Sequence, residues 1–177
     1  MTRDRDRDPS GRPRNARPRD ALGRPLDRAS PAARAGAGEA RVPDDLALPG
    51  AQAAALADEL LRAGRPFHAH EVLEASWKSG PPGERDLWQG LAQVAVGLTH
   101  AHRGNARGAV ALLTRGARRV RAYQAQARAA PGREHPYGID LAAILATADD
   151  LTARIERHGL TDIPPADLLP GLLTADR

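Results

Sequence analysis

Apolar side chains recur every three or four residues from about residue 49 to about residue 159, with prolines and glycines between successive runs. This spacing places apolar residues on one side of an α-helix, whereas a half-buried strand would alternate apolar and polar residues. Each run is also long enough to form a helix. The pattern therefore predicts helices over about 51–63, 66–78, 83–103, 106–129 and 139–157.

The residues between these runs are typical of helix ends. Gly64, Gly104 and Gly159 follow three of the runs, Pro66 suits a first helical turn, and Asn105 suits an N-cap. Short connections make consecutive helices antiparallel neighbours. We therefore expect an all-α fold, an antiparallel up-down bundle of about five helices.

The two ends of the chain lack this periodicity. Residues 1–48 are rich in arginine and proline and contain almost no large apolar side chains, so burial cannot offset the entropy lost on ordering. We predict a disordered tail over 1–48 and a helical domain over 49–160. Residues 161–177 contain three prolines and are predicted to form a C-terminal tail that docks loosely.

Most of the basic charge lies in the N-terminal segment. Residues 1–41 hold 11 arginines and 6 acidic residues, against 15 basic and 16 acidic residues in the remainder. An arginine-rich arm can bind nucleic acid through phosphates, but alternating Arg and Asp offset each other, and the arm has no aromatic ring to stack on bases. We expect a solvated linker, with nucleic-acid contact through residues 1–48 and Arg115, Arg118 and Arg119 as an alternative.

The composition also limits the chemistry and the location. The chain has no cysteine, which excludes disulfides, zinc-thiolate sites and thiol nucleophiles. No run of 18 apolar residues and no secretory signal is present, so we expect no membrane partner and a cytoplasmic location.

Two ionisable side chains interrupt the apolar stripe of the helix predicted over 66–78. At 100° per residue, one arc of about 120° contains Phe67, His70, Leu73, Glu74 and Trp77. Burying an imidazole and a carboxylate is costly unless they find partners. Trp77, on the same arc, is expected in the core.

The next helix offers such partners. Folding the two helices into a hairpin would bring His70 near Gln93 and Glu74 near Gln89. We therefore predict a buried polar seam, a name used below for His70, Glu74, Gln89 and Gln93. Such a network, fully hydrogen-bonded, would be structural.

Two glycines lie beside these glutamines, and Trp88 lies outside both stripes of the same helix. Gly90 and Gly97 each cost about 1 kcal/mol of helix propensity, which indicates the close approach of another backbone. Trp88 is expected either to pack on the helix predicted over 51–63 or 106–129, or to mark a contact surface.

A metal site is the alternative interpretation of the seam. His100 would lie about 10 Å beyond Gln93 along the helix axis, which leaves His70 and Glu74 as two good ligands where catalytic zinc usually has three. We therefore predict no cofactor. A divalent metal held by His70 and Glu74, in a metal-dependent hydrolase-like enzyme with His100 nearby, remains the alternative.

The segments FHAHEVLEASWK and LWQGLAQVAVGLTHAHRGNARGAVALL resemble the signature of the DUF309 family, over about residues 66–120. The resemblance implies a small all-helical prokaryotic protein and no known activity. The family's recurrent positions would fall on Phe67, His70, Glu71, Glu74, Trp77, Gln89, Gly90, Gln93, His100, Gly104, Asn105 and Gly108.

The function therefore stays unknown at this level, with one leading hypothesis. We expect a noncatalytic binding or scaffolding domain that contacts a protein partner or a second copy of itself, because paired helices with small residues present grooves to other helices or peptides. The candidate contact residues are His70, Glu74, Trp77, Gln89, Gln93 and His100.

Overall fold

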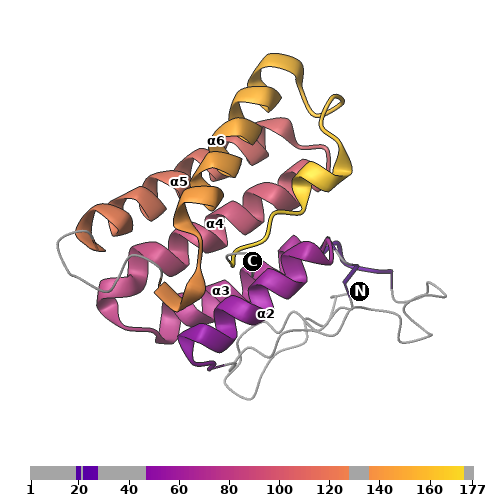
Figure 1. The fold of residues 1–177 in the computed structure, drawn as a ribbon. Helices are drawn as coiled ribbons and strands as arrows, with labels where there is room; N and C mark the ends of the chain where they lie inside the picture. The colour runs from indigo at the N-terminus through magenta and orange to yellow at the C-terminus, as the bar shows by residue number, and fades with distance from the viewer. Residues whose placement is uncertain (1–18, 21, 28–46, 128–135, 174–177) are drawn as a thin grey trace, which may run out of the picture.

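The computed structural model describes residues 19–20, 22–27, 47–127 and 136–173. Within these ranges the chain forms five α-helices, α2 (Gly50–Arg62), α3 (Pro66–Ser79), α4 (Arg85–His102), α5 (Ala106–Ala127) and α6 (Leu141–His158) (Figure 1). Three short 3-10 turns accompany them, η1 (Pro82–Glu84), η2 (Pro136–Gly138) and η3 (Pro165–Leu168). The all-α prediction is confirmed, since the described residues form only isolated β-bridges and no strand.

The helix boundaries agree with the sequence pattern to within two residues. Local chemistry explains this agreement. Gly104 adopts a positive φ of 77° directly after α4, a conformation that costs glycine little. The side chain of Asn105 then accepts a hydrogen bond from the Gly108 backbone N–H at 2.9 Å, as expected for the N-cap of α5. The expected end of this helix at 129 falls in 128–135, outside the described residues.

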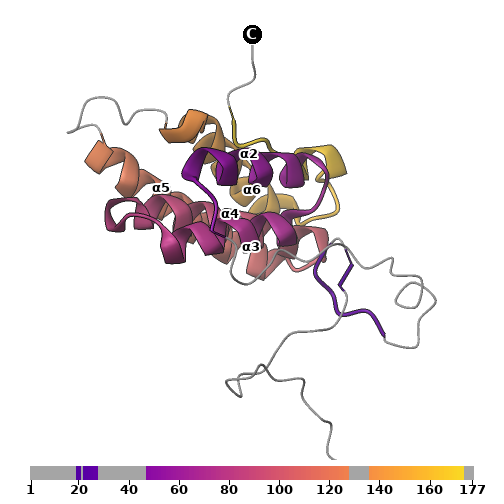
Figure 2. The ribbon, with the colours of Figure 1, turned by 90° about the horizontal axis from the view of Figure 1, so that it is seen from below.

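Consecutive helices pack against each other, as expected for an up-down bundle. Helix α4 packs against both α3 and α5, while α2 covers α3 and α6 covers α5. Figure 2 shows α2 on one side of the α3–α4 pair. The core between them consists of leucine, isoleucine, valine and alanine, with Trp88 as its largest fully buried side chain. None of the described helices is both long and apolar enough to cross a lipid bilayer.

Glycines allow α4 and α5 to approach closely. A Cβ atom on Gly90 would lie 3.0 Å from the Val120 backbone nitrogen, and one on Gly116 would lie 2.7 Å from the Gly90 carbonyl oxygen. Gly97 faces α5 in the same way, with the Leu113 backbone nitrogen 3.0 Å from an added Cβ. The predicted close approach of another backbone is therefore confirmed, and that backbone is α5 rather than α3.

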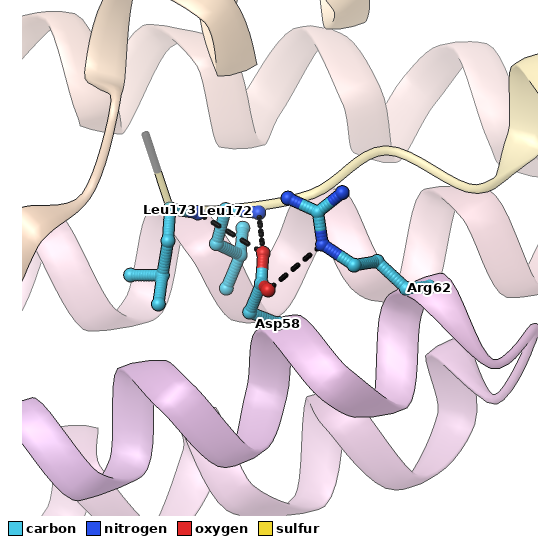
Figure 3. A network of polar contacts seen from close by, with 4 residues as sticks. All are labelled: Asp58, Arg62, Leu172 and Leu173. Carbon is cyan, nitrogen blue, oxygen red and sulfur yellow. Dashed lines mark hydrogen bonds and ion pairs between the residues drawn. The ribbon is translucent and has the colours of Figure 1, made fainter. Parts of the chain in front are cut away.

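The segment after α6 turns back across the bundle. It passes η3 and runs along α2, where the Asp58 carboxylate accepts hydrogen bonds from the backbone N–H groups of Leu172 at 2.5 Å and Leu173 at 3.0 Å (Figure 3). The other oxygen of Asp58 accepts from Arg62 Nε at 2.8 Å. One carboxylate on α2 thus satisfies two backbone donors of a segment more than a hundred residues away.

Apolar side chains of the same segment fill the core. Ile163, Leu168 and Leu172 are all less than a tenth exposed. The Leu172 carbonyl also accepts from the Asp140 backbone N–H at 2.9 Å, next to the start of α6. Residues 161–173 are therefore part of the packed domain rather than a loosely docked tail. The sequence pattern missed this because three prolines remove the helical period and leave the buried residues irregularly spaced.

A short part of the N-terminal segment is also described. The Asp20 side chain accepts from the backbone N–H groups of Leu22 and Arg24, which closes a tight turn. Gly23 lies against Phe67, since an added Cβ would clash with that ring. Most of the predicted tail over 1–48 lies outside the described residues.

Candidate functional site

The buried face of α3 differs from the predicted one. Its buried residues centre on Ala69, Val72, Leu73 and Ser76, together with Pro66 and His68 at the start of the helix. The arc that contains His70 and Glu74 therefore lies at the edge of the helix, towards solvent. The predicted stripe followed the large side chains of Phe67 and Trp77. In the structure, α3 packs closely against its neighbours through smaller residues such as Ala69 and Ser76.

Three side chains form a row along this outer edge of α3. His70 Nε2 lies 3.3 Å from Glu74 Oε2, and Lys78 Nζ lies 3.0 Å from Glu74 Oε1. The side chains of His70 and Glu74 are 23% and 35% exposed, so the pair is half-buried. The prediction of a fully buried pair was wrong, because Lys78 and solvent share the carboxylate.

Burial controls the protonation of His70. Loss of solvent lowers the pKa of the imidazole below its ordinary value of 6.5, although the Glu74 carboxylate and the Phe67 carbonyl raise it. Lys78 adds a smaller lowering effect. The neutral form of the imidazole is therefore favoured; its Nε2 faces the Glu74 carboxylate and carries the proton there, which leaves the lone pair on the buried Nδ1.

The glutamines of the polar seam do not complete the predicted network. Within the described part of the chain, neither Gln89 nor Gln93 makes a hydrogen bond to His70 or Glu74. Both glutamines are half-buried on α4. The side-chain oxygen of Gln93 is buried and has no hydrogen-bond partner among the described residues. The seam therefore contains an acceptor that is shielded from water and unused, where a satisfied structural network was expected.

The two tryptophans have different surroundings. Trp77 is half-buried at the edge of the core, and the Arg85 guanidinium lies 5.6 Å from the centre of its ring. Trp88 is buried, donates to Glu84 Oε2 at 2.9 Å and lies beside Tyr137, with ring centres 5.4 Å apart. This burial excludes the expected contact surface, and the aromatic ring beside Trp88 belongs to η2.

His100 belongs to a separate contact at the end of α4. Its Nδ1 lies 2.8 Å from the Asn105 amide nitrogen, and Asn105 is the residue that caps α5. An added Cβ on Gly108 would lie 2.6 Å from His100 Nδ1, so glycine leaves room for this arrangement. His100 is thus engaged in the α4–α5 connection.

Sequence reasoning missed the opening turn of α3. His68 is only 2% exposed, and its ring lies 5.6 Å from Phe67, edge to face. Phe67 in turn has Arg19 and Arg103 within 5.2 and 5.9 Å of its ring centre. The only available signal was the run FHAH itself, in which adjacent aromatic rings must point in different directions.

The described side chains include no group of three or more His, Asp or Glu residues that could hold a metal ion. Chemically, the seam offers a neutral imidazole, a carboxylate shared with Lys78, and an unused amide oxygen, beside a half-buried indole. The Glu74 carboxylate and the Gln93 oxygen accept hydrogen bonds, and the amide NH2 groups of Gln89 and Gln93 donate them.

Residues 55–112 match the DUF309 family model. That family is described as a domain of unknown function. The resemblance expected from the α3 and α4 motifs is confirmed, and the match extends from within α2 into α5. It contains the polar seam, Trp77 and the His100–Asn105 contact, but not the segment after α6.

The chain is also similar to a protein without a described function. An uncharacterized protein, YpuF, of Bacillus subtilis (strain 168) is 36% identical over 91 residues, which cover 51% of this chain. The matched region spans 48% of YpuF, about half of its length. No solved structure matches the chain significantly. Neither the DUF309 match nor YpuF carries a described activity, so the function of the chain is unknown.

Proposed function

We propose that the chain is a noncatalytic binding domain, and that the polar seam together with Trp77 is its partner-contact surface. The observation that carries this proposal is the buried, unused side-chain oxygen of Gln93. A buried acceptor without a donor costs roughly 1–3 kcal/mol. Gln93 as a whole is half-buried, so rotation of its amide would present this oxygen to a partner's donor and recover that free energy on binding.

The surrounding groups favour a partner that donates hydrogen bonds. Glu74 offers a carboxylate that is 35% exposed, and His70 lies beside it with Nε2 3.3 Å from Oε2. Backbone N–H groups of a peptide, or basic side chains, fit this set. Trp77 beneath Arg85 adds the aromatic–arginine combination that is enriched among the energetically important residues of interfaces.

Site-specific photo-crosslinking tests this surface. A photoreactive amino acid at Lys78, whose side chain is 63% exposed beside the seam, should yield one discrete protein adduct in cells. The same group at exposed Glu156 on α6 is the matched control and should not yield that adduct. Adding Gln93→Ala and Glu74→Ala should abolish the adduct. Identical adducts from both positions, or none from position 78, would contradict the proposal.

The partner could be a second copy of the chain, since the proposal covers both protein partners and homo-oligomers. Light scattering of the purified protein separates the two cases. A dimer that dissociates on Gln93→Ala and Glu74→Ala substitution would identify self-association through the seam. A monomer together with the adduct from position 78 would identify a different protein. The cysteine-free sequence favours the cytoplasm as the place of this contact.

A divalent metal is the second candidate for the seam, because His70 and Glu74 lie within 3.3 Å of each other at a half-exposed position. A third ligand would have to come from a partner or from water. Elemental analysis of protein purified without chelators tests this alternative. One metal ion per chain, lost on His70→Ala substitution, would favour it over the noncatalytic proposal.

A further inference from the structure

Helix α5 has an unusual charge composition. It carries Arg107, Arg115, Arg118, Arg119 and Arg121, and it contains no lysine, aspartate or glutamate. Like charges on one helix repel each other unless neighbouring elements or a ligand compensate them. Acidic residues of the neighbouring helices can provide this compensation within the fold.

The neighbouring helices neutralise two of the five. Arg119 pairs with Asp86 on α4, with Nη1 2.7 Å from Oδ1. Arg121 pairs with Asp149 on α6. These ion pairs connect α5 to the helices on either side, so both arginines serve the packing of the bundle. Arg119, which the sequence alternative grouped with the nucleic-acid contacts, therefore has an acidic partner within the fold.

The other three arginines have no such role. Arg107, Arg115 and Arg118 are exposed, and none makes a hydrogen bond or an ion pair with any residue of the described ranges. At 100° per residue they fall within an arc of about 80°, on one side of the helix. Arg107 and Arg118 are about 16 Å apart along the axis. We name these three residues the α5 arginine face.

We propose that the α5 arginine face binds the phosphate backbone of double-stranded DNA. Guanidinium groups hydrogen-bond phosphate oxygens in pairs and stay charged at every physiological pH. The separation of Arg107 and Arg118 exceeds the roughly 12 Å width of the B-form major groove, so their side chains can reach phosphates on both edges. The major groove of A-form duplex RNA is narrow, so the phosphates on its two edges lie too close together to match this spacing.

The small residues on the same side of α5 support this choice of ligand. Ala111 and Thr114 are exposed between the arginines, and exposed Ala122 lies one turn beyond Arg118. If a protein partner bound to the α5 arginine face, the interface would lack the apolar centre that protein–protein interfaces usually have. Single-stranded nucleic acid would find no aromatic ring for base stacking. Short side chains instead allow the helix to lie close to a regular array of phosphates.

The inference is independent of the proposed function of the polar seam. The seam lies on α3 and α4, whereas the arginine face lies on the solvent side of α5, and α4 packs between α3 and α5 (Figure 1). All contacts would be to phosphate, so binding should show no sequence preference. The two surfaces can therefore be tested separately on the same full-length protein.

The test measures fluorescence anisotropy of a labelled duplex of about 30 base pairs across a salt series from about 50 to 200 mM. The face variant is R107Q/R115Q/R118Q. Three lost phosphate contacts should reduce the slope of log K against log salt by about 2.7, and weaken binding at least about tenfold at low salt. A duplex of different sequence should give the same affinities.

Two matched triple variants remove the same charge elsewhere. R24Q/R34Q/R157Q changes arginines outside α5 and outside the polar seam, and R3Q/R5Q/R7Q changes the N-terminal arm. Each should reduce the slope by less than about 1. The proposal is overturned if the full chain does not bind duplex DNA at about 50 mM salt. It is equally overturned if the face variant binds like the wild type, if only the arm variant loses affinity, or if a polyglutamate peptide competes as well as DNA.

Discussion

Asn105 uses both ends of its side-chain amide. The oxygen accepts from the Gly108 N–H and caps α5, and the nitrogen lies 2.8 Å from His100 Nδ1 at the end of α4. A residue that suits an N-cap was predictable from the sequence, because capping is local. The partner of its amide nitrogen was not, because it depends on the path of the chain between two helices.

Replacing Asn105 should separate these two roles. Asn105→Ala should lower the free energy of unfolding by about 1–2 kcal/mol, since it removes the cap. Asn105→Asp keeps an oxygen for the Gly108 N–H and loses only the donor that faces His100, so its loss should be smaller. Urea denaturation measures both. Equal losses would show that the His100 contact, and not the cap, carries the stability.

Replacing Gln93 should not lower the free energy of unfolding, because its buried side-chain oxygen has no partner among the described residues. Gln93→Met replaces the amide with an apolar side chain of similar length. The free energy of unfolding should stay constant or rise by up to about 1 kcal/mol, because the unsatisfied acceptor is gone. Gln89→Met on the same helix is the control and should change stability by less than about 0.5 kcal/mol.

The same variant links stability to the proposed function. If the Gln93 oxygen is reserved for a partner, Gln93→Met should weaken the photo-crosslink from position 78 even though the protein is no less stable. A clear loss of stability in thermal melting would instead assign this oxygen to the fold.

For each helix, local residues determine where it ends, whereas the neighbouring helices determine which face it buries. The ends follow from local residues such as Gly104 and Asn105, and the sequence pattern located them to within two residues. The buried face of α3 depends on what packs against it. The pattern chose the arc with His70 and Glu74, while the structure buries Ala69, Val72 and Ser76 because α2 and α4 approach closely there.

The close contact of α4 and α5 gives a testable consequence at Gly116. An added Cβ would lie 2.7 Å from the Gly90 carbonyl oxygen and 2.9 Å from the Val94 backbone nitrogen, so the helices must separate. Gly116→Ala should lower stability by about 1–3 kcal/mol, although alanine favours helix by about 1 kcal/mol.

A second variant on α5 calibrates this helix propensity. Ala122→Gly, at an exposed position, should cost about 1 kcal/mol through propensity alone. Urea denaturation of both variants gives the comparison. If Gly116→Ala stabilised the protein by the amount that Ala122→Gly costs, the close approach of the two backbones would be refuted.

At the scale of the whole molecule, the segment after α6 closes the bundle through Asp58. Burial raises the pKa of this carboxyl, but hydrogen bonds from Arg62 and from the Leu173 and Leu172 N–H groups outweigh it, so the pKa lies below its ordinary value of 3.8. A lowered pKa means that the charged form is favoured in the folded state. The contact therefore contributes stability above pH 3.8 and loses it as the pH falls through the folded pKa.

Asp58→Ala should lower the free energy of unfolding at neutral pH by about 2–3 kcal/mol, because two backbone donors lose their acceptor. Its stability should also depend less on pH than that of the wild type below about pH 4. Asp162→Ala, which removes an exposed carboxylate, is the control. Urea midpoints between about pH 5 and pH 2.5 provide the measurement. Parallel acid curves for wild type and Asp58→Ala would contradict this assignment.

The helical class, the approximate ends of the helices and the DUF309 resemblance could be predicted from the residues alone, because helical period, caps and breakers are local properties of the chain. Three features depend instead on packing: the buried face of α3, the approach of α5 to Gly90 and Gly97, and the contribution of residues 161–173 to the core. The tertiary structure also decided which arginines of α5 find an acidic partner. These features depend on contacts between distant parts of the chain, and no local pattern of residues encodes them.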